Sequence, residues 1–239
     1  MRQAVWRVLF FMFVLVLVSG KSFAGEPYAA SGFYIGGDIY HHSISGDFEG
    51  DRAYQAAPEL EPALVFIGEI DNGPGWGARL GYRGPYYAVE FAYLSSRHDD
   101  VNEIIDAIIE NGSRKGTTAI DMLDLNLKYF FLRDKKLQPF VLLGASYIWL
   151  EQRDRFFGLS EDEEEIIDIK DAKYNNFALN VGAGLSYLVT PKIALNTGVN
   201  YRWTEFDEIR GFEAGELDPP IEFSMLSINL GLTYTFPLR

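Results

Sequence analysis

Apolar and polar residues alternate along most of the chain, in segments about as long as a membrane-crossing β-strand. The pattern is clearest from Leu226 to Phe236, where every second residue is apolar and the residues between are small or polar. In a strand such alternation gives one face of each kind. The pattern recurs in seven earlier segments, near residues 33–40, 76–83, 87–93, 123–129, 141–149, 177–189 and 193–203. We therefore predict an all-β protein with eight antiparallel strands.

The connections between these segments alternate in length. Short turns are expected at 84–85, 132–137 and 190–192, and long polar loops near 43–74, 97–117, 150–175 and 205–221. Short periplasmic turns and long extracellular loops are typical of outer-membrane barrels, in which an even strand number lets both chain ends lie on one side. The pattern predicts an up-and-down transmembrane barrel with four long extracellular loops.

Alternation leaves open which face is outside, because a soluble lipocalin-like barrel would turn its apolar face inward. The polar face here consists mainly of Gly, Ser, Asn and Ala with occasional charges, which suits the cramped interior of an eight-stranded barrel. The apolar face carries aromatic residues toward the strand ends, where amphipathic rings fit the membrane–water interfaces. We therefore expect these rings to face lipid: Tyr87, Tyr93, Tyr129, Trp149, Tyr187, Tyr201, Trp203, Tyr234 and Phe236.

The N-terminal region predicts a secretory signal peptide. Arg2 and Arg7 precede an unbroken apolar run from Leu9 to Val18, and small residues precede a cut after Ala24. The run is shorter than a membrane-spanning helix, although an uncleaved anchor is the alternative. Residues 1–24 are thus assigned to the signal peptide and residues 25–239 to one outer-membrane domain. No later stretch is apolar for long enough to span a membrane as a helix.

Charge and cysteine content narrow the function classes. The predicted mature chain keeps 18 of the 21 basic residues and all 34 acidic ones, for a formal charge of −16. This balance argues against nucleic acid as a partner, because phosphates require clustered Lys and Arg. The chain has no cysteine, so it has neither disulfides nor thiolate metal sites. We predict no cofactor.

Both ends of the predicted barrel carry a family resemblance. The opening Gly32-Phe33-Tyr34-Ile35-Gly36-Gly37 and the eight alternating segments resemble the outer-membrane β-barrel family related to OmpA and OmpX. The closing strand, with Asn229, Gly231, Tyr234 and Phe236, is similar to the final-strand signal that the barrel-assembly machinery reads. The resemblance implies an outer-membrane location, with lipid, lipopolysaccharide and the assembly machinery as partners.

Seven charged residues fall on the predicted lumen face. Charges of both signs in a narrow space should pair, because an unpartnered charge is costly to bury. One interpretation is a salt-bridged plug, and the alternative is a gate that opens when the pairs rearrange. An eight-stranded barrel is too narrow for a porin-type water channel in either case. The residues are Asp38, Arg79, Arg83, Glu90, Asp124, Lys128 and Arg202.

An enzyme is the third hypothesis, because some small outer-membrane barrels modify lipid A with Ser, His and a carboxylate. The chain offers His41-His42-Ser43 near Asp47 and Glu49, and one further histidine, His98. The spacing matches no such motif, and adjacent histidines of a strand point to opposite faces, which argues against a shared metal site. We predict no catalytic and no metal site.

Two loop segments stand out. The acidic run Glu161–Glu165 indicates a solvated loop tip, and the alternative is Ca²⁺ or Mg²⁺ bridging to lipopolysaccharide phosphates. Asp99–Asn111 has apolar residues at helical spacing, with Asp99 or Asp100 as the cap and Gly112 as the end. This predicts a short amphipathic helix that rests on the barrel rim or on the membrane interface. Its alternative role is partner binding, and the sequence identifies no surface ligand.

These observations favour a non-enzymatic envelope protein with a structural or surface-interaction role and an ion-paired lumen. A narrow channel for small or apolar solutes is the second hypothesis, and a lipid A-modifying enzyme is the third.

Overall fold

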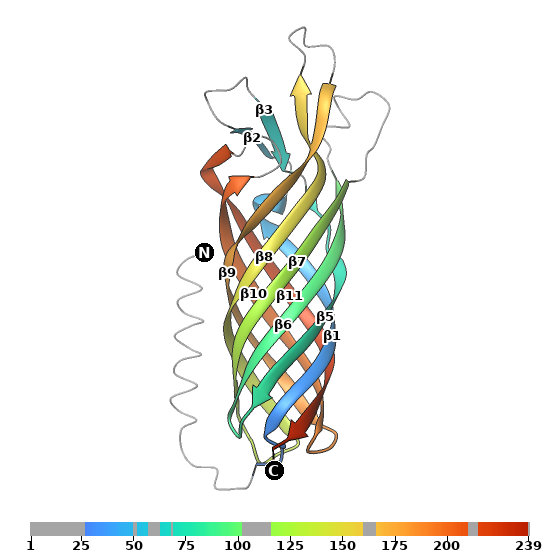
Figure 1. The fold of residues 1–239 in the computed structure, drawn as a ribbon, viewed down its shortest axis with the longest axis vertical. Helices are drawn as coiled ribbons and strands as arrows, with labels where there is room; N and C mark the ends of the chain where they lie inside the picture. The colour runs from blue at the N-terminus through green and yellow to red at the C-terminus, as the bar shows by residue number, and fades with distance from the viewer. Residues whose placement is uncertain are drawn as a thin grey trace.

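Eight long strands form the wall of a barrel in the computed structural model, which describes residues 27–49, 52–56, 63–67, 69–101, 116–159, 166–209 and 215–238 (Figure 1). The wall consists of β1 (Gly32–Gly46), β5 (Gly73–Arg83), β6 (Tyr87–Val101), β7 (Gly116–Phe130), β8 (Leu137–Leu159), β9 (Ile166–Leu188), β10 (Ile193–Ile209) and β11 (Gly215–Pro237). Shorter elements lie at the extracellular end: the 3₁₀ turn η1 (Asp47–Glu49), β2 (Arg52–Ala56), β3 (Ala63–Ile67) and β4 (Glu69–Ile70).

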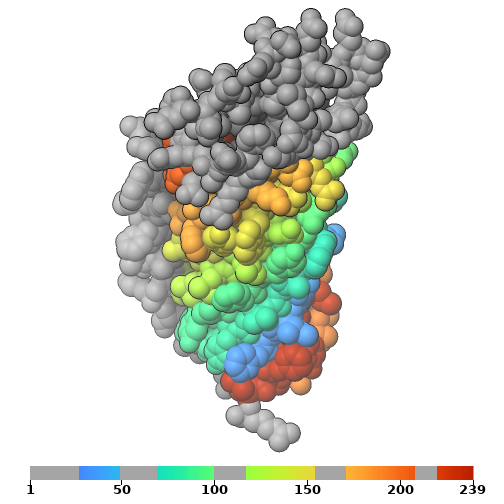
Figure 2. Space-filling model, turned by 45° about the horizontal axis from the view of Figure 1, so that its top comes forward, coloured from blue at the N-terminus to red at the C-terminus, as the bar shows by residue number. Residues whose placement is uncertain are grey.

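The first and last strands close the wall. Each wall strand pairs with its neighbour in antiparallel fashion, and β1 pairs with β5 on one side and β11 on the other. At the base Phe33 lies opposite both Tyr82 and Phe236. Figure 2 shows the blue band of β1 beside the red band of β11 on the outer surface. Closure satisfies the backbone groups of every wall strand, as hydrocarbon requires, and the predicted eight-stranded barrel is confirmed.

The apolar face of each strand points outward, as predicted. Large outward side chains such as Ile39, Leu80 and Phe177 are 63–70% exposed, far more than a water-facing surface tolerates over so wide an area. Of the predicted interface aromatics, Trp149, Trp203 and Tyr234 are about 40% exposed on this surface. Within the described residues no helix has the length and apolarity needed to cross a membrane.

The turns and loops agree with the prediction in order and differ in length. Residues 84–86, 131–136 and 189–192 form the three short turns at the end where both termini of the barrel lie. The predicted loop 150–175 is mostly strand, because β8 and β9 continue to pair beyond the wall, for example at Glu151 and Lys173. Hydrogen bonding between the backbones of two neighbouring strands does not require an apolar face, so the pairing extends past the membrane segment.

Two predicted segments fall on residues that the structure does not describe, and the start of the predicted loop helix is wrong. The predicted signal peptide falls within residues 1–26, and the acidic run Glu161–Glu165 also lies outside the described part. The predicted loop helix cannot begin at Asp99 or Asp100, because both belong to β6, which pairs with β7 up to Asp100. The rest of that predicted helix falls in residues 102–115, which are not described.

Candidate functional site

Room for large side chains inside the barrel comes from a stripe of glycines on β5. Gly73, Gly75 and Gly77 alternate on the inward face, and a Cβ atom at Gly75 would lie 2.7 Å from His42 Nε2. A Cβ atom at Gly73 would likewise meet the His98 ring, and a Cβ atom at Gly77 would meet the Tyr40 ring. Only residues without a side chain let these rings lie flat against the strand.

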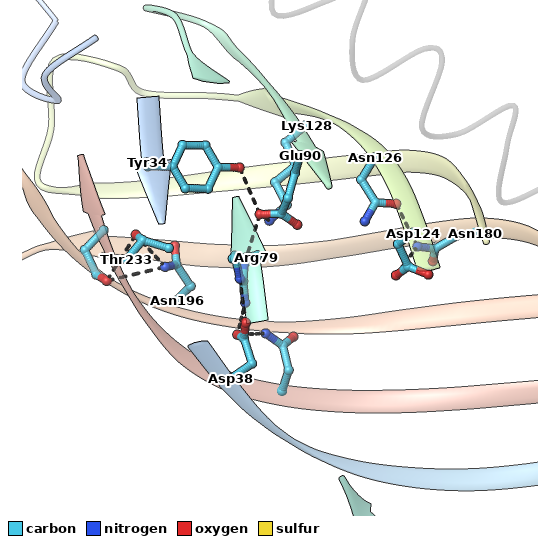
Figure 3. Close-up of polar contacts among 12 residues, drawn as sticks. Tyr34, Asp38, Arg79, Glu90, Asp124, Asn126, Lys128, Asn180, Asn196 and Thr233 are labelled. Carbon is cyan, nitrogen blue, oxygen red and sulfur yellow. Dashed lines mark hydrogen bonds and ion pairs between the residues drawn. The ribbon is translucent and has the colours of Figure 1, made fainter. Parts of the chain in front are cut away.

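The centre of the lumen is crossed by a chain of charged groups (Figure 3). Arg79 pairs with Asp38 on one side and donates to Glu90 Oε2 at 3.3 Å on the other. Lys128 Nζ lies 2.7 Å from the same oxygen, and the Tyr34 hydroxyl donates to it at 2.9 Å. Glu90 of β6 therefore accepts from side chains of three other strands, β1, β5 and β7, and it is 3% exposed. Charge-assisted hydrogen bonds of this kind are the strong ones in a poorly hydrated space.

A second pair lies toward the extracellular end. Arg202 Nη2 is 2.6 Å from Asp124 Oδ2, and the guanidinium also donates to the hydroxyls of Ser146 and Ser227. Asn180 donates to Asn126 at 2.8 Å beside this pair (Figure 3). The Asp124–Arg202 pair joins β7 to β10 across the lumen, since these strands are not neighbours in the wall.

All seven predicted lumen charges lie inside the barrel, and each is at most 6% exposed. Six of them form the ion pairs described above. Arg83 lies apart from every described carboxylate and donates instead to the amide oxygen of Gln138. Pairing could not be assigned from the sequence, because it depends on which inward positions face each other across the closed barrel.

Described residues of the lumen line two small cavities, each of about 20 Å³. One lies beside Asp124 and Arg202, and the other lies toward the periplasmic end beside Arg83. Arg79, Glu90 and Lys128 line both cavities, so these three side chains stand between them. Figure 3 shows Tyr34 and Thr233 on one side of Arg79 and Asp124 on the other. A cavity of this size accommodates about one water molecule.

An apolar cluster, which the sequence analysis did not predict, lies in the lumen toward its extracellular end, beside buried polar side chains such as His42, His98 and Gln152. Phe48 in η1 is fully buried, with its ring centroid 5.7–6.3 Å from those of Tyr174, Phe206 and Phe223. Inward side chains from most wall strands complete this outer plug: Ile44, Leu94, Ile120, Met122, Ile148, Leu150 and Met225. The available signal was the loss of alternation in segment 148–150, where both faces of the strand carry large apolar residues.

The histidines do not form a shared site. His41 is exposed on the outer face and His42 is fully buried inside, where its Nδ1 lies 2.8 Å from Ser227 Oγ. His98 Nδ1 donates to the Asp71 carbonyl oxygen, since a carbonyl only accepts, and its Nε2 therefore accepts from Ser96. His98 lies on the extracellular part of β6, and burial lowers its pKa. In the described parts of the chain no three His, Asp or Glu side chains cluster as metal ligands do.

The predicted assembly-signal residues divide between the two faces of β11. Asn229 points inward and donates to Asp38 Oδ1 at 3.0 Å, and Gly231 lies directly against the same carboxylate. Tyr234 and Phe236 point outward, with ring centroids 4.9 Å apart at the periplasmic end. The final strand thus presents its aromatic residues to lipid and holds the lumen network with its small and polar ones.

Comparison with solved structures agrees with this architecture. The chain superimposes on OprG from Pseudomonas aeruginosa with a TM-score of 0.57 at 14% identity, covering 88% of this chain and 98% of that chain. For AlkL the TM-score is 0.55 at 17% identity, and the match covers 91% of this chain and 96% of that chain. For Neisserial surface protein A the TM-score is 0.50 at 17% identity, and the match covers 87% of this chain and 99% of that chain. Identities this low show a common fold. Among curated proteins none matches the sequence significantly.

A family model described as the outer membrane protein beta-barrel domain matches residues 11–236. This match covers all eight wall strands, and it places the protein in the outer membrane of a Gram-negative envelope, among lipid and lipopolysaccharide. The chain belongs to the outer-membrane β-barrel family.

Proposed function

We propose that this protein is a non-enzymatic, non-conducting barrel that anchors its extracellular loops in the envelope, for a structural or surface-interaction role. The observation that carries the proposal is the position of Arg79, Glu90 and Lys128 between the two lumen cavities. A hydrated ion would have to separate these pairs to pass. Breaking a buried ion pair costs on the order of 3–5 kcal/mol, so the closed arrangement dominates.

Further obstructions lie on both sides of this central pair. On the periplasmic side the Arg83 guanidinium lies 4.0 Å from the centre of the Phe130 ring, which packs against Phe140. On the extracellular side Phe48 fills the apolar plug. Three successive constrictions along the lumen favour a closed barrel whose role is to hold its extracellular loops.

The buried position of His42 supports a role without catalysis. His42 and Ser227 are within hydrogen-bond distance of each other, and both are fully buried in the lumen. Ser43, which the lipid A hypothesis requires next to His42, lies on the opposite face of β1. A nucleophile and base that act on a lipid need access to its headgroup, which these positions do not offer.

A narrow conduit for small or apolar solutes is the second candidate, and the apolar outer plug favours it. Displacement of Phe48 would expose an apolar chamber lined by Leu94, Ile120 and Met122. Uptake of an apolar fluorescent probe into proteoliposomes, compared between the wild type and Phe48→Ala, tests this candidate. Faster uptake with wild-type protein than with empty liposomes would favour it over the closed barrel.

Single-channel recording in planar bilayers tests the main proposal. We expect no reproducible conductance steps from the wild type. Replacing Arg79, Glu90 and Lys128 with Ser in combination with Arg83→Ser and Phe48→Ala should produce steps, because it removes all three constrictions. The matched control replaces the exposed pair Glu151 and Lys173 with Ser and should stay silent. Steady openings of the wild type would overturn the proposal.

We also propose that the final strand carries the signal for the barrel-assembly machinery. Phe236 is the outward aromatic residue near the end of β11, and its partner on β1 is Phe33, which is also strongly exposed. Phe236→Ala should slow insertion into proteoliposomes that contain the machinery, whereas Phe33→Ala should not. Equal insertion rates for the two variants would contradict this assignment.

A further inference from the structure

Arg83 carries a positive charge that the other described side chains of the lumen do not balance. It is the last residue of β5, directly before the periplasmic turn 84–86, and it is 5% exposed. Its Nη2 donates to Gln138 Oε1, and its guanidinium carbon lies 4.0 Å from the centre of the Phe130 ring. The Nε group is buried and has no hydrogen-bond acceptor in the described structure.

The partner of Arg83 is neutral, and its orientation is fixed. Gln138 Nε2 donates to the carbonyl oxygens of Arg133 and Lys135, at 2.8 and 2.9 Å. Its Oε1 must therefore face Arg83, and it cannot turn to satisfy the guanidinium further. Gln138 supplies a hydrogen bond and no charge.

The other lumen charges compensate one another. Two carboxylates, Asp38 and Glu90, face two cations, Arg79 and Lys128, and Asp124 faces Arg202. The seven charged side chains of the described lumen thus leave one positive charge, which belongs to Arg83. A buried charge without a partner costs several kcal/mol, which a counterion would offset.

A cavity of about 20 Å³ lies next to this charge. Arg79, Arg83 and Lys128 line it with three positive charges, and Glu90 contributes the single negative one. The Glu90 carboxylate already accepts hydrogen bonds from Tyr34, Arg79 and Lys128, so its negative charge compensates those cations and not Arg83. Thr233, Thr235 and Asn196 also line it. The Asn196 amide donates to Thr233 Oγ1 and the Thr233 hydroxyl to the Ala194 carbonyl oxygen, whereas the Thr235 hydroxyl can donate to an occupant.

We propose that this cavity is a binding site for one small monovalent inorganic anion of the size of chloride, which acts as the counterion of Arg83. The volume of about 20 Å³ fits one water-sized group. The anion exchanges with the periplasm, because Arg83 and the adjoining turn form that end of the lumen. The site does not depend on whether the barrel conducts.

Bromide is the probe for a direct test on the full mature chain, folded in detergent and crystallised in sodium bromide. An anomalous difference peak is expected in the cavity beside Arg83, and it should be absent in Arg83→Met. Density at this position without anomalous signal would identify water and overturn the proposal. A peak that persists in Arg83→Met would overturn the assignment to Arg83.

Stability in solution provides a second readout. Urea unfolding is measured in sodium chloride and in sodium gluconate, an anion too large for the cavity, at equal ionic strength. The folded-to-unfolded ratio of the wild type should rise with chloride by a factor of 1 + [Cl⁻]/Kd. Arg83→Met should lose this dependence, and Lys136→Met, which removes an exposed cation of the neighbouring turn, should keep it. Identical wild-type curves in the two salts would overturn the proposal.

Discussion

The Glu90→Gln variant tests how far buried charge pairs stabilise this barrel. The substitution keeps the size of the side chain and removes its charge. Oε2 of Glu90 accepts from Tyr34, Arg79 and Lys128 within 3.3 Å, and the side chain is almost fully buried. Arg79 keeps Asp38 as a partner after the change, whereas Lys128 has no other carboxylate in the described structure.

The expected loss of folding free energy follows from the Lys128 charge, which stays buried after Glu90 is neutralised. Removing one member of a buried pair costs about 3–5 kcal/mol, because the other charge stays buried without a partner. The Phe140 ring, 5.3 Å from Lys128 Nζ, offsets part of this cost, so we expect a value of about 3 kcal/mol. With a urea slope of about 1–3 kcal/mol/M, the midpoint of unfolding falls by roughly 1–3 M.

Urea unfolding of the protein in lipid vesicles, followed by tryptophan fluorescence, measures this midpoint. The matched control is Glu151→Gln, which breaks an exposed pair with Lys173 at 3.9 Å and should cost less than about 1 kcal/mol. The double variant Glu90→Gln with Lys128→Met removes both charges and should recover much of the loss. The reasoning is refuted if Glu90→Gln costs no more than Glu151→Gln, or if the double variant is less stable than Glu90→Gln alone.

Three further predictions concern the plug, the extracellular histidine and the final strand. Phe48→Ala should lower the free energy of unfolding by about 3–5 kcal/mol, measured by urea titration, because it leaves a cavity among three aromatic rings. Stability should fall as pH drops through about 6.5, because burial lowers the pKa of His98 in the folded protein and protons bind more tightly to the unfolded chain; His98→Gln should flatten this part of the pH profile. Gly231→Ala should cost about 1–3 kcal/mol, because a Cβ there overlaps the Asp38 carboxylate, whereas the outward Gly37→Ala should change the unfolding midpoint little.

The alternation of residue types was sufficient to predict the wall. Side chains of a strand point alternately to its two faces, so segments such as 226–236 carry their own assignment of lipid face and lumen face. The short turns followed from Gly84-Pro85 and Thr190-Pro191-Lys192, since proline and glycine end strands locally. Strand number and orientation required no knowledge of distant contacts.

The extent of the strands was harder to predict. Polar residues beyond Leu150 resemble loop residues, yet β8 and β9 continue to pair there. Hydrogen bonding between two neighbouring strands does not require an apolar face, so hydropathy carries no signal for it. Asp99 and Asp100 are likewise polar residues typical of a helix start, and nothing in their hydropathy shows that they continue β6.

The sequence by itself determined a membrane barrel with an inward face of small and charged residues, because strand periodicity is a local property. Only the tertiary structure decided that Arg79 joins Asp38 to Glu90, that Arg202 reaches Asp124, 78 residues away, and that Arg83 is left without a carboxylate. These pairings depend on the register in which β1 meets β5 and β11 when the wall closes. Closure also brings Phe48 into the extracellular end, where apolar residues from many strands meet only in the folded barrel.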